Sequence, residues 1–156
     1  MRDRLNEQAA KHRQDLPNGT YSFGSKLKTS MKMDVYGGFR SDCANVQLWA
    51  GNGTNAQKWK VTHDANGYVT LTSVNSGKVL DVYGASTANG ANVQQYASNN
   101  TYAQKWIAVR NPDGSYVFQS ALVENMVLDI SGGSSTNGAN VQLYKSNNTN
   151  AQKWTI

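Results

Sequence analysis

Hydrophobic and polar residues alternate in short runs along most of the chain, which is the pattern of half-buried β-strands. In the middle of the chain such runs lie near residues 68–73, 78–83, 92–97 and 104–109. Turn-forming stretches rich in Gly, Asn and Ser separate them, for example residues 74–77 and 84–90. The pattern therefore predicts short strands joined by tight turns, with no helix among them.

The same succession of runs occurs three times. Residues 43–59 read CANVQLWAGNGTNAQKW, residues 90–106 read GANVQQYASNNTYAQKW, and residues 138–154 read GANVQLYKSNNTNAQKW. Equivalent aspartates and tryptophans are 47 and 48 residues apart. A repeat of this length corresponds to one supersecondary unit used several times. The predicted repeats are residues 18–62, 63–110 and 111–156.

Four strands in each of three repeats give twelve short strands with pseudo-three-fold symmetry. This number predicts an all-β chain folded as a β-trefoil, in which three hairpins close a six-stranded barrel. A three-bladed propeller is the less favoured alternative, because propellers usually have four to eight blades. One domain is therefore expected over residues 18–156.

Residues 1–17 belong to no repeat and are predicted to be a linker or an N-terminal helical extension. Their sequence is polar and compatible with a helix, and it ends at Pro17. Glu7 and Lys11 have the i,i+4 spacing of a stabilising helical pair. A helix that docks on a neighbouring domain is the alternative interpretation.

One acidic residue interrupts an apolar strand in each repeat. In the second repeat, Leu80 and Val82 share one face of the strand, and Asp81 occupies the other face. The aliphatic neighbours are expected to face the core, so each repeat should turn one carboxylate outward. The equivalent carboxylates are Asp34, Asp81 and Asp129.

The following strand carries an amide and an aromatic ring on its outward face. In the first repeat, Val46 and Leu48 share the buried face and leave Gln47 and Trp49 on the other. The equivalent outward pairs are Gln94 with Tyr96 and Gln142 with Tyr144. A ring can cover the C–H face of a pyranose, while carboxylates and amides form hydrogen bonds with its hydroxyls. The triplicated combination favours sugar binding, although the same side chains could instead cap turns and brace hairpins.

The AQKW sequences that end the repeats suggest a structural role. Their tryptophans are expected to fill the barrel core: Trp59, Trp106 and Trp154. Their glutamines are expected to satisfy nearby backbone groups: Gln57, Gln104 and Gln152.

Charge and composition exclude several function classes. The 156-residue chain has a net charge of +5, but its lysines are scattered, so no nucleic-acid partner is expected. The single cysteine, Cys43, allows no internal disulfide. No apolar run approaches the length of a membrane span, so no membrane insertion is expected. No secretory signal is recognisable among these residues, and a leader or further domains could lie outside them.

The repeated sequences resemble the ricin B-type β-trefoil lectins with their QxW repeat, a type that includes carbohydrate-binding modules of bacterial glycosidases. The resemblance covers residues 18–156 and implies binding of galactose-type or other sugars, with at most one site per repeat. It assigns sugar hydrogen bonding to Asp34, Asp81 and Asp129, ring stacking to Trp49, Tyr96 and Tyr144, and a polar partner role to Gln47, Gln94 and Gln142.

Two departures from the family pattern bear on these sites. Many of these lectins have a sugar-contacting Asn directly before the QxW glutamine, where this chain has Ala56, Ala103 and Ala151. Asn55 and Asn150 lie one residue earlier, and Tyr102 takes that place in the middle repeat. In the first repeat, Cys43 replaces the glycine that completes a left-handed Asn-Gly turn in the others. A different loop beside Trp49 is therefore expected, and the second and third sites are favoured over the first.

The chain is predicted not to be an enzyme. HExxH, GxSxG, P-loop and clustered-cysteine motifs are absent, and the three aspartates should lie on separate sectors of the barrel. No catalytic residue, metal site or cofactor is expected.

The predicted function is non-catalytic binding of a glycan or polysaccharide, of galactose type or from a plant or microbial cell wall. The resemblance implies a bacterial targeting module of a larger secreted protein or glycoside hydrolase, acting extracellularly or at the cell surface. The main alternative is a protein-interaction or inhibitor β-trefoil that has lost sugar binding. Binding of heparin-like polyanions, based on the net charge, is a third hypothesis.

Overall fold

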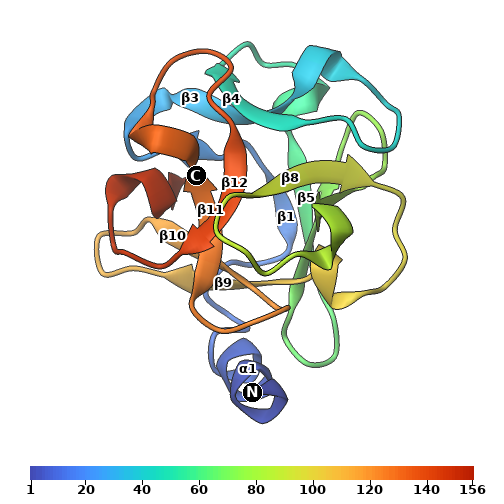
Figure 1. Ribbon diagram of the computed structural model, residues 1–156, viewed down its shortest axis with the longest axis vertical. Coiled ribbons are helices and arrows are strands. Elements are labelled where there is room, and N and C mark those ends of the chain that lie inside the picture. Colours follow the sequence, from blue (N-terminus) through green and yellow to red (C-terminus); the bar gives the residue numbers. More distant parts are fainter.

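The computed structural model describes all 156 residues and contains thirteen strands and one α-helix (Figure 1). The first repeat holds β1 (Gly19–Tyr21), β2 (Gly24–Ser25), β3 (Lys28–Val35), β4 (Val46–Ala50) and β5 (Trp59–His63). The second holds β6 (Val69–Ser73), β7 (Val79–Val82), β8 (Ala91–Tyr96) and β9 (Trp106–Arg110). The third holds β10 (Tyr116–Ser120), β11 (Met126–Ile130), β12 (Val141–Lys145) and β13 (Trp154–Thr155).

The strands form a closed barrel and three hairpins, which confirms the predicted β-trefoil. Antiparallel pairing runs from β1 through β5, β6, β9, β10 and β13 to β2. β1 and β2 are two parts of one strand, separated by Ser22 and the buried Phe23. Counted together, they give each repeat the four strands that the sequence predicts. The hairpins are β3–β4, β7–β8 and β11–β12.

Short 3₁₀ turns lie between the strands, contrary to the expectation that no helical segment occurs there. One turn follows each Asp-bearing strand: η1 (Tyr36–Gly38), η3 (Tyr83–Ala85) and η5 (Ser131–Gly133). A second precedes each buried tryptophan: η2 (Asn55–Gln57), η4 (Tyr102–Gln104) and η6 (Asn150–Gln152). The last strand of the second repeat, expected near residues 104–109, lies at Trp106–Arg110. The Gln104 amide N–H closes the turn on the Thr101 carbonyl at 3.1 Å, and the strand starts at Trp106.

The barrel core contains the three QxW tryptophans, as the sequence predicts. Trp59, Trp106 and Trp154 have no solvent exposure and belong to one hydrophobic cluster. The Trp59 indole N–H donates to the Met33 carbonyl oxygen at 3.1 Å, directly before Asp34 in the chain. Trp106 donates in the same way to the Leu80 carbonyl oxygen at 3.4 Å, whereas the buried indole N–H of Trp154 has no hydrogen-bond partner. In the first two repeats the core tryptophan thus also supports the strand that carries the carboxylate.

Helix α1 (Arg2–Lys11) packs against the barrel beside β9, at the opposite end of the view from the β3–β4 hairpin (Figure 1). Leu5 and Ala9 are buried against Tyr68 and Ile107. The helix passes so close to Gly67 that an added Cβ there would lie 2.3 Å from the Ala9 carbonyl oxygen. The division between tail and trefoil at residue 17 stays a prediction. The helix is too short and too polar to cross a membrane.

A ring of three asparagine side chains joins the hairpins. The Asn45 amide donates to Asn140 at 2.8 Å, Asn140 donates to Asn92 at 2.9 Å, and Asn92 donates back to Asn45 at 2.8 Å. The three residues occupy equivalent positions in the repeats, directly before Val46, Val93 and Val141. Three equivalent positions of the repeated sequence therefore meet in one closed cycle of hydrogen bonds.

Candidate functional site

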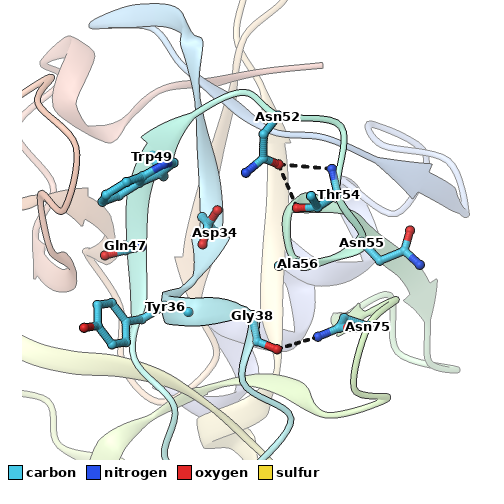
Figure 2. A pocket seen from close by; sticks show the side chains of 11 residues that line it. Asp34, Tyr36, Gly38, Gln47, Trp49, Asn52, Thr54, Asn55, Ala56 and Asn75 are labelled. Atoms are coloured by element: carbon cyan, nitrogen blue, oxygen red, sulfur yellow. Dashed lines mark hydrogen bonds between the residues drawn. The ribbon is translucent and has the colours of Figure 1, made fainter.

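Each repeat forms one shallow pocket beside its hairpin, and the three pockets have cavity volumes of about 490, 440 and 580 Å³. The nine predicted site residues divide among them in threes. The first pocket contains Asp34, Gln47 and Trp49 (Figure 2), the second Asp81, Gln94 and Tyr96, and the third Asp129, Gln142 and Tyr144. The structure therefore brings each predicted carboxylate, amide and aromatic ring together.

The three aspartates line the pockets without projecting into solvent. They point away from the barrel core, as the strand alternation predicts, yet only 5 to 6% of each residue is exposed. In this respect the expectation of outward-turned carboxylates is wrong. The paired strand and the following 3₁₀ turn cover them, because the hairpin and the QxW segment lie on either side of each carboxylate.

The QxW glutamines fix these carboxylates in place. Gln57 donates to Asp34 at 2.7 Å and to the Ala50 carbonyl at 3.0 Å, and its own oxygen accepts the Asn52 N–H at 2.9 Å. The equivalent carboxylate bonds join Gln104 to Asp81 at 2.8 Å and Gln152 to Asp129 at 2.9 Å. The sequence predicted the backbone contacts of these glutamines but missed the carboxylate, which is the link between the QxW motif and the site.

A second amide lies across the strand pair from each carboxylate. Gln94 donates to Asp81 at 3.2 Å, and Gln142 donates to Asp129 at 3.0 Å. Gln47 is the direct cross-strand neighbour of Asp34. Because a carboxylate can accept about four hydrogen bonds, these contacts leave acceptor positions for a ligand in the pocket.

Burial changes the acidity of two of these groups. Burial raises the pKa of Asp34 above the ordinary value of 3.8, and the hydrogen bond from Gln57 opposes part of this shift. The pKa of Asp81 is raised in the same way, with Gln104 opposing. Desolvation disfavours the charged form, and the amide donors favour it.

The stacking residues present accessible rings. Trp49 and Tyr144 are each 38% exposed, and Tyr96 is half-buried. Each lies two residues after the site glutamine on the same strand and therefore on the same face. An accessible ring beside a buried carboxylate offers an apolar surface next to hydrogen-bond acceptors.

The second pocket differs from the other two in the residue that stands two positions before the QxW glutamine. Asn55 lines the first pocket and Asn150 lines the third, so an amide is present one residue earlier than in the family pattern. Tyr102 does not line the second pocket. Its ring lies under the Arg2 guanidinium, 3.5 Å from the ring centroid, and beside Tyr68. The middle repeat therefore uses this position to hold helix α1.

The first repeat keeps the turn that its sequence was expected to change. Cys43 adopts a left-handed φ of 69°, close to the values of 84° and 89° at Gly90 and Gly138. Asp42 accepts the Ala97 N–H at 2.9 Å, as Asn89 and Asn137 accept equivalent backbone groups. The prediction of a different loop at this turn is therefore wrong, because these contacts hold the backbone in place despite the Cβ atom of Cys43.

A buried glutamine from the second repeat fastens the same loop. Gln95 occupies the position of the core residues Leu48 and Leu143, and it has no solvent exposure. Its amide donates to the carbonyl oxygens of Phe39 and Ser41 at 2.9 and 2.8 Å. Replacement of an aliphatic residue by an amide in one repeat of three was the sequence signal for this contact.

Sequence reasoning also missed several residues that line the pockets. Asn52, Asn99 and Asn147 form Asx turns with the threonines two residues later, in the triplicated N-x-T pattern. Tyr36 and Tyr83 line the first and second pockets. Neighbouring repeats contribute Asn75 to the first pocket and Cys43 to the second.

The arrangement can recognise hydroxyl groups and apolar ring faces, but it contains no pair of groups arranged for covalent chemistry. Each pocket holds one carboxylate, flanked by amides. No group of three or more His, Cys, Asp or Glu side chains is placed to hold a metal ion. A closed barrel with one such pocket per repeat defines a β-trefoil of the lectin class.

Comparison with known proteins identifies the family. The sequence profile described as "Ricin-type beta-trefoil lectin domain-like" matches residues 55–144 and 102–156. The chain belongs to this ricin-type β-trefoil lectin family, whose general activity is carbohydrate binding. No curated protein sequence gives a significant match.

Solved structures share the fold over nearly the whole chain. The designed three-fold symmetric protein ThreeFoil is 33% identical, with a TM-score of 0.84 over 88% of this chain and 97% of its own. The exo-β-1,3-galactanase 1,3Gal43A of Clostridium thermocellum is 28% identical, with a TM-score of 0.83 over 87% of this chain but 29% of its own. The Rhizoctonia solani agglutinin is 25% identical, with a TM-score of 0.81 over 90% and 94%.

Proposed function

We propose that the chain is a non-catalytic lectin module that binds galactose-type sugars through its three pockets. In each pocket the carboxylate and amide form hydrogen bonds with vicinal hydroxyls, and the ring stacks on the C–H face of the pyranose. The binding residues are Asp34, Gln47 and Trp49, then Asp81, Gln94 and Tyr96, then Asp129, Gln142 and Tyr144.

The observation that carries this proposal is the buried carboxylate held by amides beside an accessible ring. Burying a charged group is costly unless its partners favour the charged form. All three repeats keep this combination, although no core packing requires a carboxylate on the outer face. A role in binding explains why the chain repeats an arrangement that folding alone would not favour.

Similarity supports both the sugar class and the biological setting. A relative with 28% identity is an exo-β-1,3-galactanase, and the present fold covers 29% of that chain. We therefore propose that the module directs an attached enzyme or surface protein to galactose-containing polymers outside the cell. Several weak sites on one rigid body can gain avidity on such a polymer.

A glycan-array screen of the chain tests this proposal. The wild-type protein should bind selected galactose-containing glycans. The Asp34→Asn, Asp81→Asn, Asp129→Asn triple variant should lose this binding while keeping its circular dichroism spectrum. Equal binding by the folded triple variant would refute the proposed sites. A blank array with a folded wild-type protein would favour the protein-interaction trefoil instead.

One observation supports the alternative of protein interaction. The loop between β3 and β4 in the first repeat has an exposed aromatic surface. Tyr36 and Phe39 are each 53% exposed, and their ring centroids are 5.7 Å apart. Arg40 lies beside them in the loop. This patch has no counterpart in the other repeats, where Ser86 and Ser134 replace Phe39.

A further inference from the structure

An accessible tyrosine borders the first two pockets but not the third. Tyr36 and Tyr83 follow the site aspartates by two residues, and they are 53% and 61% exposed. Both line the same pocket as the aspartate of their own repeat. The third repeat has Ser131 at this position.

The fold does not require these rings. The 3₁₀ turn forms with Ser131 as it does with tyrosine, and the following glycines have φ values of 63°, 62° and 65° in the three repeats. Tyr83 has no aromatic neighbour, and its hydroxyl makes no hydrogen bond within the protein. Its exposed apolar surface is therefore unexplained by folding.

The tyrosine and the stacking residue lie on opposite sides of the carboxylate. On the β3–β4 hairpin, Trp49 is opposite Lys32, two residues before Asp34, whereas Tyr36 follows Asp34 by two residues. The strand from Lys32 to Val35 spans about 10 Å, and Tyr36 follows it as the first residue of the 3₁₀ turn. Figure 2 shows Trp49 and Tyr36 on either side of the Asp34–Gln47 pair. A single pyranose that stacks on Trp49 and bonds to Asp34 cannot also cover Tyr36.

We infer that Tyr36 and Tyr83 form a second stacking platform for the neighbouring sugar of a glycan chain. The first and second sites therefore bind a disaccharide unit or longer, whereas the third site binds one terminal sugar. This inference rests on the proposed function, because it places a second sugar next to the one held by the carboxylate. The partner is an unbranched segment of a galactose-containing polysaccharide.

Single-site proteins test this inference by isothermal titration with galactose and β-1,3-linked galactobiose. Asp81→Asn with Asp129→Asn leaves the first site, and Asp34→Asn with Asp81→Asn leaves the third. The first-site protein should bind the disaccharide about two- to twelvefold more tightly than galactose, since an aromatic contact contributes about 0.5–1.5 kcal/mol. The third-site protein should show no such gain.

Exchange of tyrosine and serine between the first and third sites provides the matched control. Tyr36→Ser should reduce the disaccharide gain of the first site to that of the third. Ser131→Tyr should create a gain in the third site. The second platform would be overturned if the higher affinity for the disaccharide survived Tyr36→Ser, or if the first-site protein bound both sugars equally. Either result would leave the proposed lectin function intact. No binding of either sugar by the folded wild-type protein would overturn both.

Discussion

At the residue scale, the site depends on carboxylates that the fold buries and glutamines that keep them hydrogen-bonded. Asp34 and Gln57 are 23 residues apart in sequence, yet their side chains meet at 2.7 Å in a buried environment. The glutamine also ties the carboxylate to the loop after β4 through Ala50 and Asn52. Stability and binding therefore share one hydrogen-bond network in each repeat.

Removal of this glutamine should destabilise the protein markedly. Gln57→Ala removes three hydrogen bonds and leaves a buried carboxylate with fewer partners, which predicts a loss of about 3 kcal/mol in the free energy of unfolding. Urea unfolding measures the change. The neighbouring Lys58→Ala is the control and should cost less than about 0.5 kcal/mol, because the Lys58 side chain forms no hydrogen bond or ion pair. Equal losses in the two variants would contradict the network.

The raised pKa values of Asp34 and Asp81 predict opposite pH effects on sugar binding and on stability. Binding needs the carboxylate as an acceptor, so it should weaken as pH falls through the raised pKa, above the ordinary 3.8. The folded state holds these protons more tightly than the unfolded chain. The two carboxyl groups therefore contribute more to the free energy of unfolding as pH falls through the same range, and this contribution is lost again as pH rises.

Measurement in the Asp129→Asn variant isolates the first two sites. Galactan pull-down between pH 7 and pH 4 follows binding, and urea unfolding relative to the triple Asp→Asn variant follows stability. Binding that stays constant until the ordinary aspartate pKa is reached would contradict the role of burial.

At the element scale, equivalent turns of the three repeats have the same backbone conformation although their sequences differ. In the first repeat this conformation costs backbone strain. Cys43 holds a left-handed turn in which the other repeats have glycine. An L-residue in this region costs roughly 1–2 kcal/mol, and glycine avoids most of that strain. The cross-repeat contacts of Asp42 and Gln95 offset the strain in the first loop.

Cys43→Gly should therefore stabilise the protein by about 1 kcal/mol, after subtraction of the entropy that glycine loses on folding. Thermal and urea unfolding measure the gain. Gly90→Ala, the reverse change in the second repeat, should be destabilising by a similar amount. Destabilisation by Cys43→Gly would show that the thiol makes a favourable contact that outweighs the strain.

At the scale of the whole molecule, the asparagine ring fixes the three hairpins and therefore the three pockets relative to one another. Backbone pairing also joins Asn45 to Gln94, Asn140 to Gln47 and Asn92 to Gln142. Each ring asparagine therefore pairs with a site glutamine of another repeat. A rigid spacing of sites is what avidity on a repeating polymer requires.

The closed ring predicts non-additive effects of mutation. Asn92→Ala removes two of three side-chain hydrogen bonds and should cost about 2 kcal/mol. A second change, Asn140→Ala, removes only the remaining bond, so the double variant should lose about 3 kcal/mol instead of the sum of about 4. A double-mutant cycle by urea unfolding measures the difference. Strictly additive losses would show that each asparagine acts alone.

The sequence by itself determined the repeats, the strand pattern, the buried tryptophans and the location of the carboxylate, amide and ring on one face. These features are local, because strand alternation and turn residues act over a few positions and the repeats display them three times. The chain order of four strands per repeat was sufficient to predict the trefoil.

The tertiary structure alone decided which contacts cross between repeats and between distant segments. Tyr102 turns toward Arg2 instead of the second pocket, Gln95 reaches the first loop, and Asn75 completes the first pocket. The burial of the aspartates also depends on the QxW turn folding back over the hairpin. Such contacts follow from barrel closure and strand register, which bring together residues that no local pattern relates.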